Sequence, residues 1–319
     1  MKRLISIAAA ALSLSIFQCF AQGYPSKPVH VIIGFTAGTA TDILARVLSQ
    51  KLAEFWNQSV VAENRPGAGS TIAAAAVAKA APDGYVLLFN SSAQSINPAL
   101  YAKLPYDNKD FVDIAPVAAQ PNILVVSPAS SIKSVADLIA EAKAKPGQIN
   151  FGSAGVGTAT HFNLEKFKLM TGIDVTHIPY KGTPEVVTDI IGGRTTAYFA
   201  PISAAISLIQ GGKLRALAVS TAKRAIQLPN VPTIAEAGVP GFEFALWFGL
   251  WAPAGTPAEV VDKISKDTMR AVATADVREQ FAKLGSEPLS MTPAEFSRYV
   301  RKETEDNARV VKAAGIKAP

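Results

Sequence analysis

The residues best suited to chemistry form a short loop after the first apolar run of the chain. Residues 29–35 are rich in β-branched side chains and predict a strand buried on both faces. Apolar residues recur at helical spacing from Ile43, so a helix is expected to begin near Asp42, capped by Thr41 or Asp42. Small side chains, hydroxyls and free helix N–H groups predict an anion site, although an ordinary capped strand-to-helix turn has the same composition. The candidate residues are Thr36, Ala37, Gly38, Thr39, Ala40, Thr41 and Asp42.

A second loop of the same kind follows residues 149–152, which are predicted to form another short strand. It contains glycines, a serine and threonines, and it precedes an apolar helix expected to continue to Met170. The candidate binding residues here are Ser153, Gly155, Gly157 and Thr158, with His161 on the first turn of the helix. Residues 155–157 are not a dinucleotide fingerprint, because Thr160 replaces the third glycine and no acidic residue about twenty positions later completes a Rossmann unit.

Catalytic constellations are sparse in the chain. Of the three histidines, His30 and His177 lie inside predicted strands, and His161 alone lies near a candidate site. Residues 152–155 lack the spacing of a G-x-S-x-G nucleophile motif, and no histidine pair has the spacing of zinc ligands. The sequence therefore predicts no enzyme, no metal site and no cofactor.

Strands alternate with helices along the chain, which predicts an α/β fold with parallel sheets covered by helices on both faces. The expected strands are residues 29–35, 59–62, 85–89, 123–126, 149–152, 175–178, 197–199, 214–219 and 242–252. The last of these is rich in aromatic residues, which indicate core and hinge packing or a ring that stacks on a flat ligand. Two or three amphipathic helices are expected after Pro257.

The strand, loop and helix near Phe35 are echoed near Phe151, which predicts two similar lobes that face each other. The C-terminal helices are expected to fold back on the first lobe, so that the chain crosses between the lobes twice. The predicted lobes are residues 22–123 with 244–319, and residues 124–243. Each lobe is expected to be a mainly parallel sheet flanked by helices.

The first 21 residues have the features of a cleavable export signal. Lys2 and Arg3 precede an apolar run to Phe20, and small residues permit cleavage after Ala21. A retained anchor helix is the alternative, but the run is short for a bilayer span. Cleavage would remove Cys19, the single cysteine, and lower the formal net charge from +6 to +4. We expect a periplasmic monomer with no disulfide, no nucleic acid partner and no stable membrane insertion.

Seven distinctive motifs occur between Glu63 and Gly238, and the resemblance that they carry extends over residues 24–317. They are Glu63-Asn64-Arg65-Pro66-Gly67-Ala68-Gly69, Ala80-Ala81-Pro82-Asp83-Gly84-Tyr85, Asn97-Pro98-Ala99-Leu100-Tyr101, Phe151-Gly152-Ser153-Ala154-Gly155, Pro179-Tyr180-Lys181-Gly182, Gly212-Lys213-Leu214-Arg215-Ala216-Leu217-Ala218 and Pro232-Thr233-Ile234-Ala235-Glu236-Ala237-Gly238. Found together in this order, they resemble the TctC/Bug family of extracytoplasmic receptors for tripartite tricarboxylate transporters.

The resemblance implies a two-lobed flytrap fold that closes on its ligand. It implies that backbone amides and hydroxyls of residues 36–42 hold a ligand carboxylate, often with ordered waters. The opposing lobe would contribute residues 153–158, and the loop after residues 85–89 would contribute Ser91 and Ser92.

Two departures from the family pattern bear on the ligand. The family's first loop usually reads Pro-Gly-Gly-Ser-Thr-Asp, whereas residues 37–42 read Ala-Gly-Thr-Ala-Thr-Asp. A strand end that commonly reads Phe-Asp-Asn is Phe199-Ala200-Pro201 here, so Ala200 and Pro201 replace an acid that could pair with a ligand amine. We therefore expect a less polar or aromatic acid as the ligand, and not an amino acid.

Together these features predict a solute-binding protein that captures a small mono- or dicarboxylate by domain closure. Its expected partners are that carboxylate and the membrane subunits of a tripartite tricarboxylate transporter. Two alternatives remain: an exported enzyme such as a hydrolase, and a periplasmic sensor subunit that uses the same closure.

Overall fold

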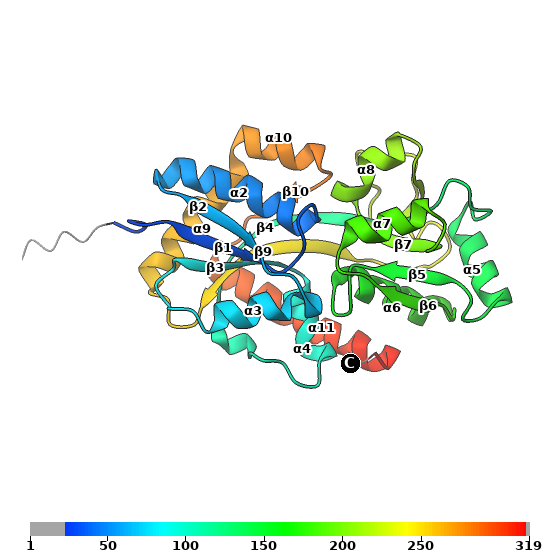
Figure 1. Cartoon of the computed structure of the whole chain (residues 1–319), viewed down its shortest axis with the longest axis horizontal. Coiled ribbons are helices and arrows are strands. Elements are labelled where there is room, and N and C mark those ends of the chain that lie inside the picture. Colours follow the sequence, from blue (N-terminus) through cyan, green and yellow to red (C-terminus); the bar gives the residue numbers. More distant parts are fainter. Residues whose placement is uncertain (1–22, 317–319) are drawn as a thin grey trace, which may run out of the picture.

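The computed structural model describes residues 23–316, which form two lobes joined by one curled sheet (Figure 1). The predicted signal peptide, residues 1–21, lies outside the described residues. The strand order is β2-β1-β3-β9-β4-β7-β5-β6, with β8 and β10 also paired to β4. The strands are β1 (Val29–Ile33), β2 (Val60–Asn64), β3 (Val86–Ser91), β4 (Phe111–Val126), β5 (Asn150–Ser153), β6 (Thr176–Pro179), β7 (Ala197–Pro201), β8 (Arg215–Val219), β9 (Ala245–Pro253) and β10 (Glu287–Pro288).

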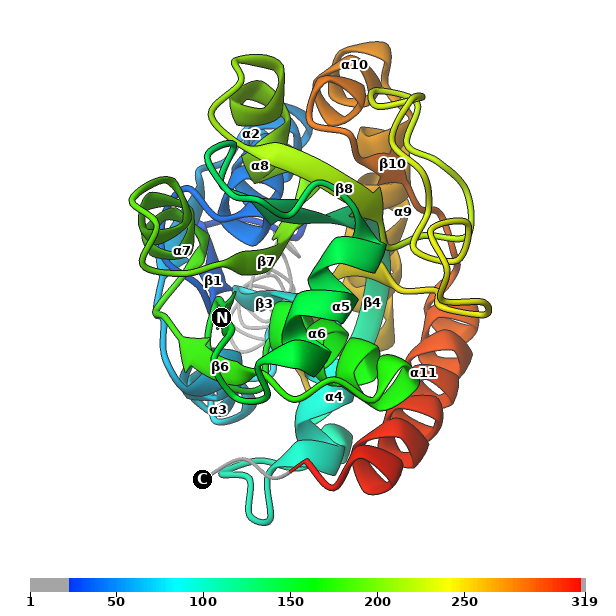
Figure 2. The same cartoon turned by 90° about the vertical axis from the view of Figure 1, so that its right-hand side faces the viewer.

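Helices cover the sheet of each lobe. They are α2 (Ala40–Trp56), α3 (Thr71–Ala78), α4 (Ala93–Leu100), α5 (Val135–Ala144), α6 (Ala159–Thr171), α7 (Thr183–Ile191), α8 (Ile202–Gln210), α9 (Ala258–Ala273), α10 (Ala275–Lys283) and α11 (Pro293–Ala314), with short 3-10 turns η1 (Ala68–Ser70) and η2 (Asn108–Asp110). The first lobe carries β1–β3, and the second lobe carries β5–β7 with α5–α8, which face the viewer in Figure 2. No helix among the described residues is long and apolar enough to span a bilayer.

Parallel pairing within each lobe agrees with the parallel sheets that the alternation of strands and helices predicts. Strand β1 pairs in parallel with β2 and β3, and β5 pairs in parallel with β6 and β7. A helix follows each of these strands. It carries the chain back to the end of the sheet at which the next parallel strand begins. The carboxyl ends of β1, β3, β5 and β6 consequently lie toward the junction between the lobes (Figure 1).

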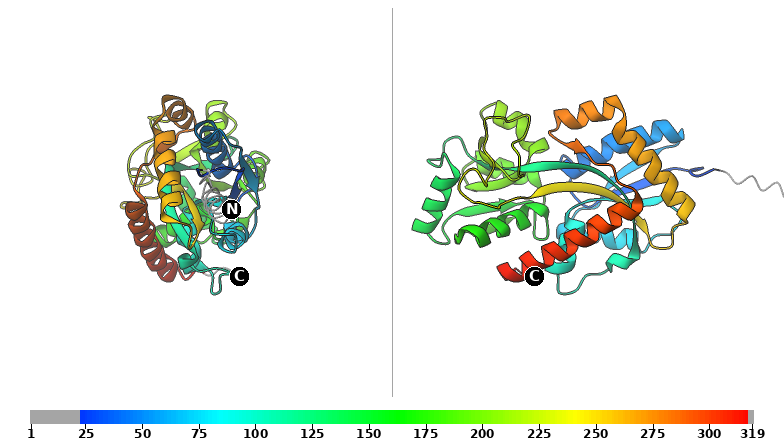
Figure 3. Two further views of the ribbon diagram at one scale, coloured as in Figure 1. Left: turned by 90° about the vertical axis from the view of Figure 1, so that its left-hand side faces the viewer. Right: turned by 180° about the vertical axis from the view of Figure 1, so that it is seen from behind.

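Two antiparallel strands connect the lobes. Strand β4 pairs with β9 from Phe111 to Pro121, and then with β7 from Asn122 to Val126. The view from behind in Figure 3 shows β4 and β9 running together through the middle of the molecule. The sequence predicted only residues 123–126 as strand, because Pro116 and Pro121 interrupt its pattern. Register shifts on both sides of Pro116 accommodate that proline in the ladder.

The aromatic residues of β9 form the core of the first lobe. Trp247, Phe248 and Trp251 are buried, and Phe296 of α11 packs against both tryptophan rings. The Trp251 indole N–H donates to Asp113 Oδ1 at 2.7 Å. This arrangement supports the packing interpretation of the aromatic strand. Of the C-terminal helices, α9 and α10 pack on α2 of the first lobe, whereas α11 contacts α4 and also α6 of the second lobe.

Candidate functional site

Helix α2 begins at the end of the first candidate loop. Thr39 is its N-cap, with φ −75° and ψ 160°, and its Oγ1 accepts a hydrogen bond from Asp42 N at 3.4 Å. The same hydroxyl donates to Thr36 O at 2.9 Å, which fixes the turn before the helix. The expected cap, Thr41 or Asp42, was wrong, because the helix starts earlier than its apolar periodicity indicated. The N–H groups of Ala40 and Thr41 have no acceptor among the described residues.

Helix α6 begins with the same geometry in the second lobe. Thr158 is its N-cap, with φ −81° and ψ 160°, and its Oγ1 accepts from His161 N at 3.3 Å. That hydroxyl donates to Gly155 O at 2.7 Å, as Thr39 does to Thr36. Within residues 23–316 the N–H groups of Ala159 and Thr160 also lack an acceptor. The two lobes thus present matching helix starts with free donors.

These two helix starts line one small cavity, which we call the junction cavity. Its volume is about 30 Å³, enough for a carboxylate head or one or two waters. The residues that line it are Phe35, Thr39, Ala40, Thr41, Ser91, Ala154, Thr158, Ala159, Thr160, Thr183, Pro201 and Leu246. None of them is charged, so the positive ends of the two helix dipoles face the cavity without a neighbouring acid in its lining.

Six of the predicted site residues meet at this cavity: Thr39, Ala40, Thr41, Ser91, Thr158 and Pro201. The partners of Ser91 and Pro201 in the prediction, Ser92 and Ala200, are buried and do not line it. Ala200 and Pro201 are successive residues of β7, so their side chains point to opposite faces of the sheet, whereas Ser92 already belongs to the start of α4 as its N-cap. Ala37 and Gly38 lie on the exposed outer side of the first loop.

Asp42 supports the first loop from behind. Its Oδ2 accepts from Gly38 N at 3.0 Å, and its Oδ1 accepts from Arg46 Nε at 2.9 Å and Asn64 Nδ2 at 2.8 Å. Burial alone would raise the pKa of Asp42, but these hydrogen bonds together hold it below its usual value. The Gly38 N–H is therefore hydrogen-bonded to Asp42 and is not free for a ligand. Asp42 positions the loop without lining the cavity.

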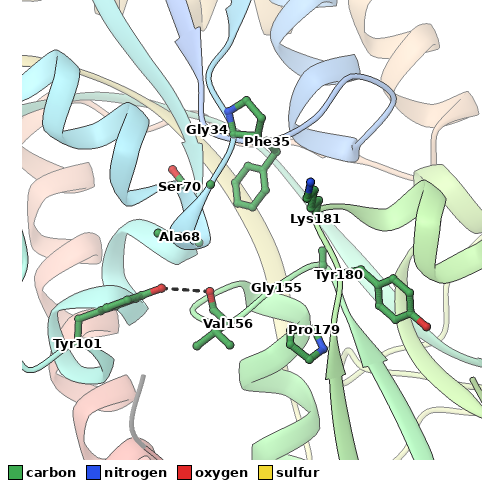
Figure 4. Close-up of a pocket in the computed structure, with 14 residues that line it drawn as sticks. Gly34, Phe35, Ala68, Ser70, Tyr101, Gly155, Val156, Pro179, Tyr180 and Lys181 are labelled. Atoms are coloured by element: carbon green, nitrogen blue, oxygen red, sulfur yellow. Dashed lines mark hydrogen bonds between the residues drawn. The ribbon is translucent and has the colours of Figure 1, made fainter. Parts of the chain in front are cut away.

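A larger cavity, the outer cavity, continues from the junction cavity toward solvent. Its volume is about 540 Å³, and Figure 4 shows the residues that line it. It shares Phe35 and Ala154 with the junction cavity. The lining residues are Gly34, Phe35, Pro66, Gly67, Ala68, Gly69, Ser70, Tyr101, Ala154, Gly155, Val156, Pro179, Tyr180 and Lys181. Both lobes contribute to this list. Of the predicted site residues, Gly155 lies here.

Residues 66–70 form a wall that the sequence prediction missed. Gly67, Ala68, Gly69 and Ser70 all have positive φ, which is uncommon for Ala68 and Ser70. This left-handed turn brings Gly69 so close to the second lobe that a Cβ there would lie 2.5 Å from Val156 O. The Gly-Ala-Gly sequence was the available signal for such a turn, but it did not indicate which cavity the turn would line.

Besides the approach of Gly69 to Val156, the lobes touch at further residues around the two cavities, and we call this the closed arrangement. Tyr101 donates its hydroxyl hydrogen to Val156 O at 3.3 Å (Figure 4), and Gly157 lies against the Asn97 side chain. The hydroxyl of Thr36 packs directly against Gly182 of the second lobe. Thr36 and Gly157, both predicted ligand residues, therefore serve as contacts between lobes and line neither cavity.

Ser153 and His177 form a hydrogen-bonded pair behind the second loop. Ser153 Oγ lies 2.6 Å from His177 Nε2, and the His177 ring stacks on His161 at 4.3 Å between ring centroids. A Ser–His pair at the end of a strand could be a nucleophile and its base. Ser153 is fully buried, however, and lines neither cavity, so a ligand in either cavity would not reach its hydroxyl. The pair supports the loop: Ser153 Oγ also accepts from Gly155 N at 3.1 Å.

No group of three or more His, Cys, Asp or Glu side chains within residues 23–316 is placed to hold a metal ion.

The stacked histidines predict acid sensitivity of the fold. Burial, the neighbouring His177 and Lys168 lower the pKa of His161 to about 3, and burial and Lys168 lower the pKa of His177 to about 4. Unfolded histidine takes up a proton near pH 6.5, so the unfolded state binds more protons than the native state between pH ~6.5 and ~4. The free energy of unfolding should therefore fall as the pH drops through this window, by at most about 1.4 kcal/mol per pH unit per histidine.

Urea unfolding at pH 7, 6 and 5 measures this slope. The double variant His161→Gln/His177→Gln should show a flatter dependence of the unfolding free energy on pH than the unaltered protein. If the unfolding free energy of the double variant depends on pH as steeply as that of the unaltered protein, the two histidines are not the source of the acid sensitivity.

Comparison with known proteins identifies the family. The family model described as the tripartite tricarboxylate transporter family receptor matches residues 44–316. Protein BugT of Bordetella pertussis is 36% identical over 300 residues, covering 93% of this chain and 92% of BugT.

Solved structures agree with that match. R. palustris Rpa4515 with adipate has a TM-score of 0.89 and 36% identity, covering 92% of this chain and 99% of that one. The periplasmic binding protein BugD has a TM-score of 0.88 and 33% identity, over 92% and 99% of the two chains. MatC (Rpa3494) of Rhodopseudomonas palustris with bound malate has a TM-score of 0.86 and 29% identity, over 90% and 100%.

These matches confirm the predicted two-lobed flytrap fold of periplasmic binding proteins. The chain belongs to the TctC/Bug family of tripartite tricarboxylate transporter receptors.

Proposed function

We propose that this protein is a periplasmic, monomeric receptor that binds a small carboxylate between its lobes and presents the closed form to the membrane subunits of a tripartite tricarboxylate transporter. The observation that carries the proposal is the junction cavity, where two capped helix starts point four free N–H groups at one uncharged space. A carboxylate head there would bridge the lobes and favour the closed arrangement through contacts that an open form lacks.

The bound molecules of two relatives support a carboxylate ligand. Rpa4515 is described with adipate and MatC with malate, and both are dicarboxylates. In this chain the lining of both cavities contains no acidic residue, and Pro201 lies at the end of β7 on the cavity wall. We infer that the ligand is an acid without an amino group, because no carboxylate in either lining would pair with an ammonium.

We also propose that the lobes are residues 22–123 with 244–319, and residues 124–243. The support is that β4 changes its partner from β9 to β7 between Pro121 and Asn122, close to the first proposed boundary. Ala245, close to the second, pairs with Pro121 at the same level of the sheet.

Calorimetric titration of the mature protein tests the binding proposal. Adipate, malate, benzoate and aspartate are compared with adipamide, the uncharged diamide of adipate. We expect at least one of the acids without an amino group to bind, with little heat from aspartate or adipamide. At a hundredfold its dissociation constant, that acid should also stabilise the protein by ~2.7 kcal/mol in thermal unfolding. Tight binding of aspartate alone, or of adipamide as well as adipate, would contradict the proposal.

A further inference from the structure

Lys181 differs in charge from every other residue that lines the two cavities. It lies in the loop between β6 and α7, and it is the single charged side chain in the lining of the outer cavity. Its side chain is exposed, and no ion pair with another described residue engages it. Phe35 of the first lobe and Lys181 of the second lobe both line the outer cavity, and Figure 4 labels both. An uncompensated cation therefore faces a cavity that continues from the proposed carboxylate site.

The backbone that carries Lys181 is held firmly. Tyr180 N donates to Ser153 O at 3.0 Å, and the Tyr180 hydroxyl lies 2.7 Å from Asp189 Oδ2 and 2.6 Å from Thr195 Oγ1. The Tyr180 ring consequently points away from the outer cavity, as Figure 4 shows. The Lys181 main chain is thus positioned, while its ammonium group remains available to a ligand.

Lys181 also lies close enough to the junction cavity for one ligand to reach both. Thr183, two residues further along the chain, lines that cavity. Two residues span at most about 7 Å, so the start of the Lys181 side chain is within that distance of Thr183. The lining between them is mostly apolar, with Phe35, Val156 and Pro179 among its residues. An anion site, an apolar wall and a cation therefore follow one another along the cavities. This order matches a ligand with an apolar middle and an acid group at each end.

We propose that Lys181 binds the second carboxylate of an elongated dicarboxylate whose first carboxylate occupies the junction cavity. This inference rests on the proposed function and narrows its substrate class to diacids with an apolar middle. The charged pair is partly exposed to solvent, so it selects diacids over monoacids by a modest factor and weakens with salt.

Titration of paired acids tests the role of Lys181. Adipate and hexanoate have the same chain length and differ in one carboxylate. We expect Lys181→Met to weaken adipate binding about 3- to 5-fold and to leave hexanoate binding nearly unchanged, because methionine keeps the bulk and removes the charge. Lys181→Arg should restore most of the preference for adipate. Lys213→Met, at an exposed lysine between α8 and β8, is the matched control and should change neither affinity.

The outcomes separate the two proposals. Equal weakening of both acids in Lys181→Met, or no weakening of adipate, would overturn the role of Lys181 and leave the carboxylate receptor intact. If the unaltered protein binds neither adipate nor hexanoate, the role of Lys181 is wrong, whereas binding of malate or benzoate would still support the carboxylate receptor. The preference for adipate should also shrink when sodium chloride is raised from 20 mM to about 500 mM, since a partly exposed ion pair is screened.

Discussion

Replacing Ala40 with proline is expected to weaken ligand binding roughly 10- to 150-fold while leaving the fold intact. Ala40 is the first residue of α2, and its free N–H lies at the junction cavity. Proline has no N–H, so the variant removes one donor from the carboxylate and places ring atoms where that hydrogen pointed. A hydrogen bond to a charged group contributes about 1.5–3 kcal/mol, which corresponds to this range of affinities.

The helix itself should tolerate the change. Proline is favoured at the first helical position, where its φ already suits the helix, and the residue before it must be extended. Thr39 meets that condition with ψ 160°. Ala275→Pro is a matched control, because Ala275 is the first residue of α10, is exposed, and follows Thr274 with ψ 148°.

Calorimetric titration and far-UV circular dichroism check this prediction together. Ala40→Pro should retain the helical signal and the unfolding midpoint of the control, yet bind the ligand weakly. Ala159→Pro, at the start of α6, should lose affinity similarly, since the two junctions share one geometry. Unaltered affinity in both variants would remove the helix N–H groups from the binding site.

The second large effect is expected from Gly182→Ala, which should hinder closure of the lobes. Gly182 precedes α7 with φ −175°, an extended backbone that alanine adopts without strain. A Cβ there would overlap the Thr36 hydroxyl of the first lobe. The clash arises where the lobes meet, so it penalises the closed arrangement. Overpacking of this kind costs about 1–3 kcal/mol, which predicts a loss of affinity of roughly 5- to 150-fold.

Removing the Thr36 hydroxyl should reverse the effect. The Thr36 Cβ lies 3.5 Å from the added Cβ, which is an ordinary contact, so Thr36→Ala/Gly182→Ala is expected to recover most of the affinity. Small-angle scattering at saturating ligand should give a larger radius of gyration for Gly182→Ala than for the double variant. Wild-type affinity in Gly182→Ala would show that bound lobes do not meet at these two residues.

Much of the local structure follows from short stretches of sequence. The predicted strands lie within two residues of the observed bounds of β1, β2, β3, β5, β6, β7 and β8, and Ser134, a residue type favoured at helix N-caps, caps α5. The hydroxyl loops before α2 and α6 are recognisable because small residues between an apolar strand and an apolar helix form a local pattern. Strand β4 is the exception. Its two prolines obscure a strand that exists because neighbouring strands and bulges accommodate them.

The sequence could not indicate which loop residues face a ligand. Ser91 lines the junction cavity while Ser92 does not, and Pro201 does while Ala200 does not. The choice depends on how each strand end is oriented in the assembled sheet. Gly38 has its N–H bonded to Asp42, a pairing that becomes visible only when α2 starts at Ala40.

The chain by itself therefore determined the α/β class, the two matching loops and the small, hydroxyl-bearing character of the anion site, because these depend on neighbours a few residues apart. The tertiary structure decided the rest. It brings residues 66–70 and Lys181, far apart in the chain, to one outer cavity, and it sets Thr36 against Gly182 across the cleft. Those contacts depend on the angle at which β4 and β9 join the lobes, and that angle results from packing over the whole sheet.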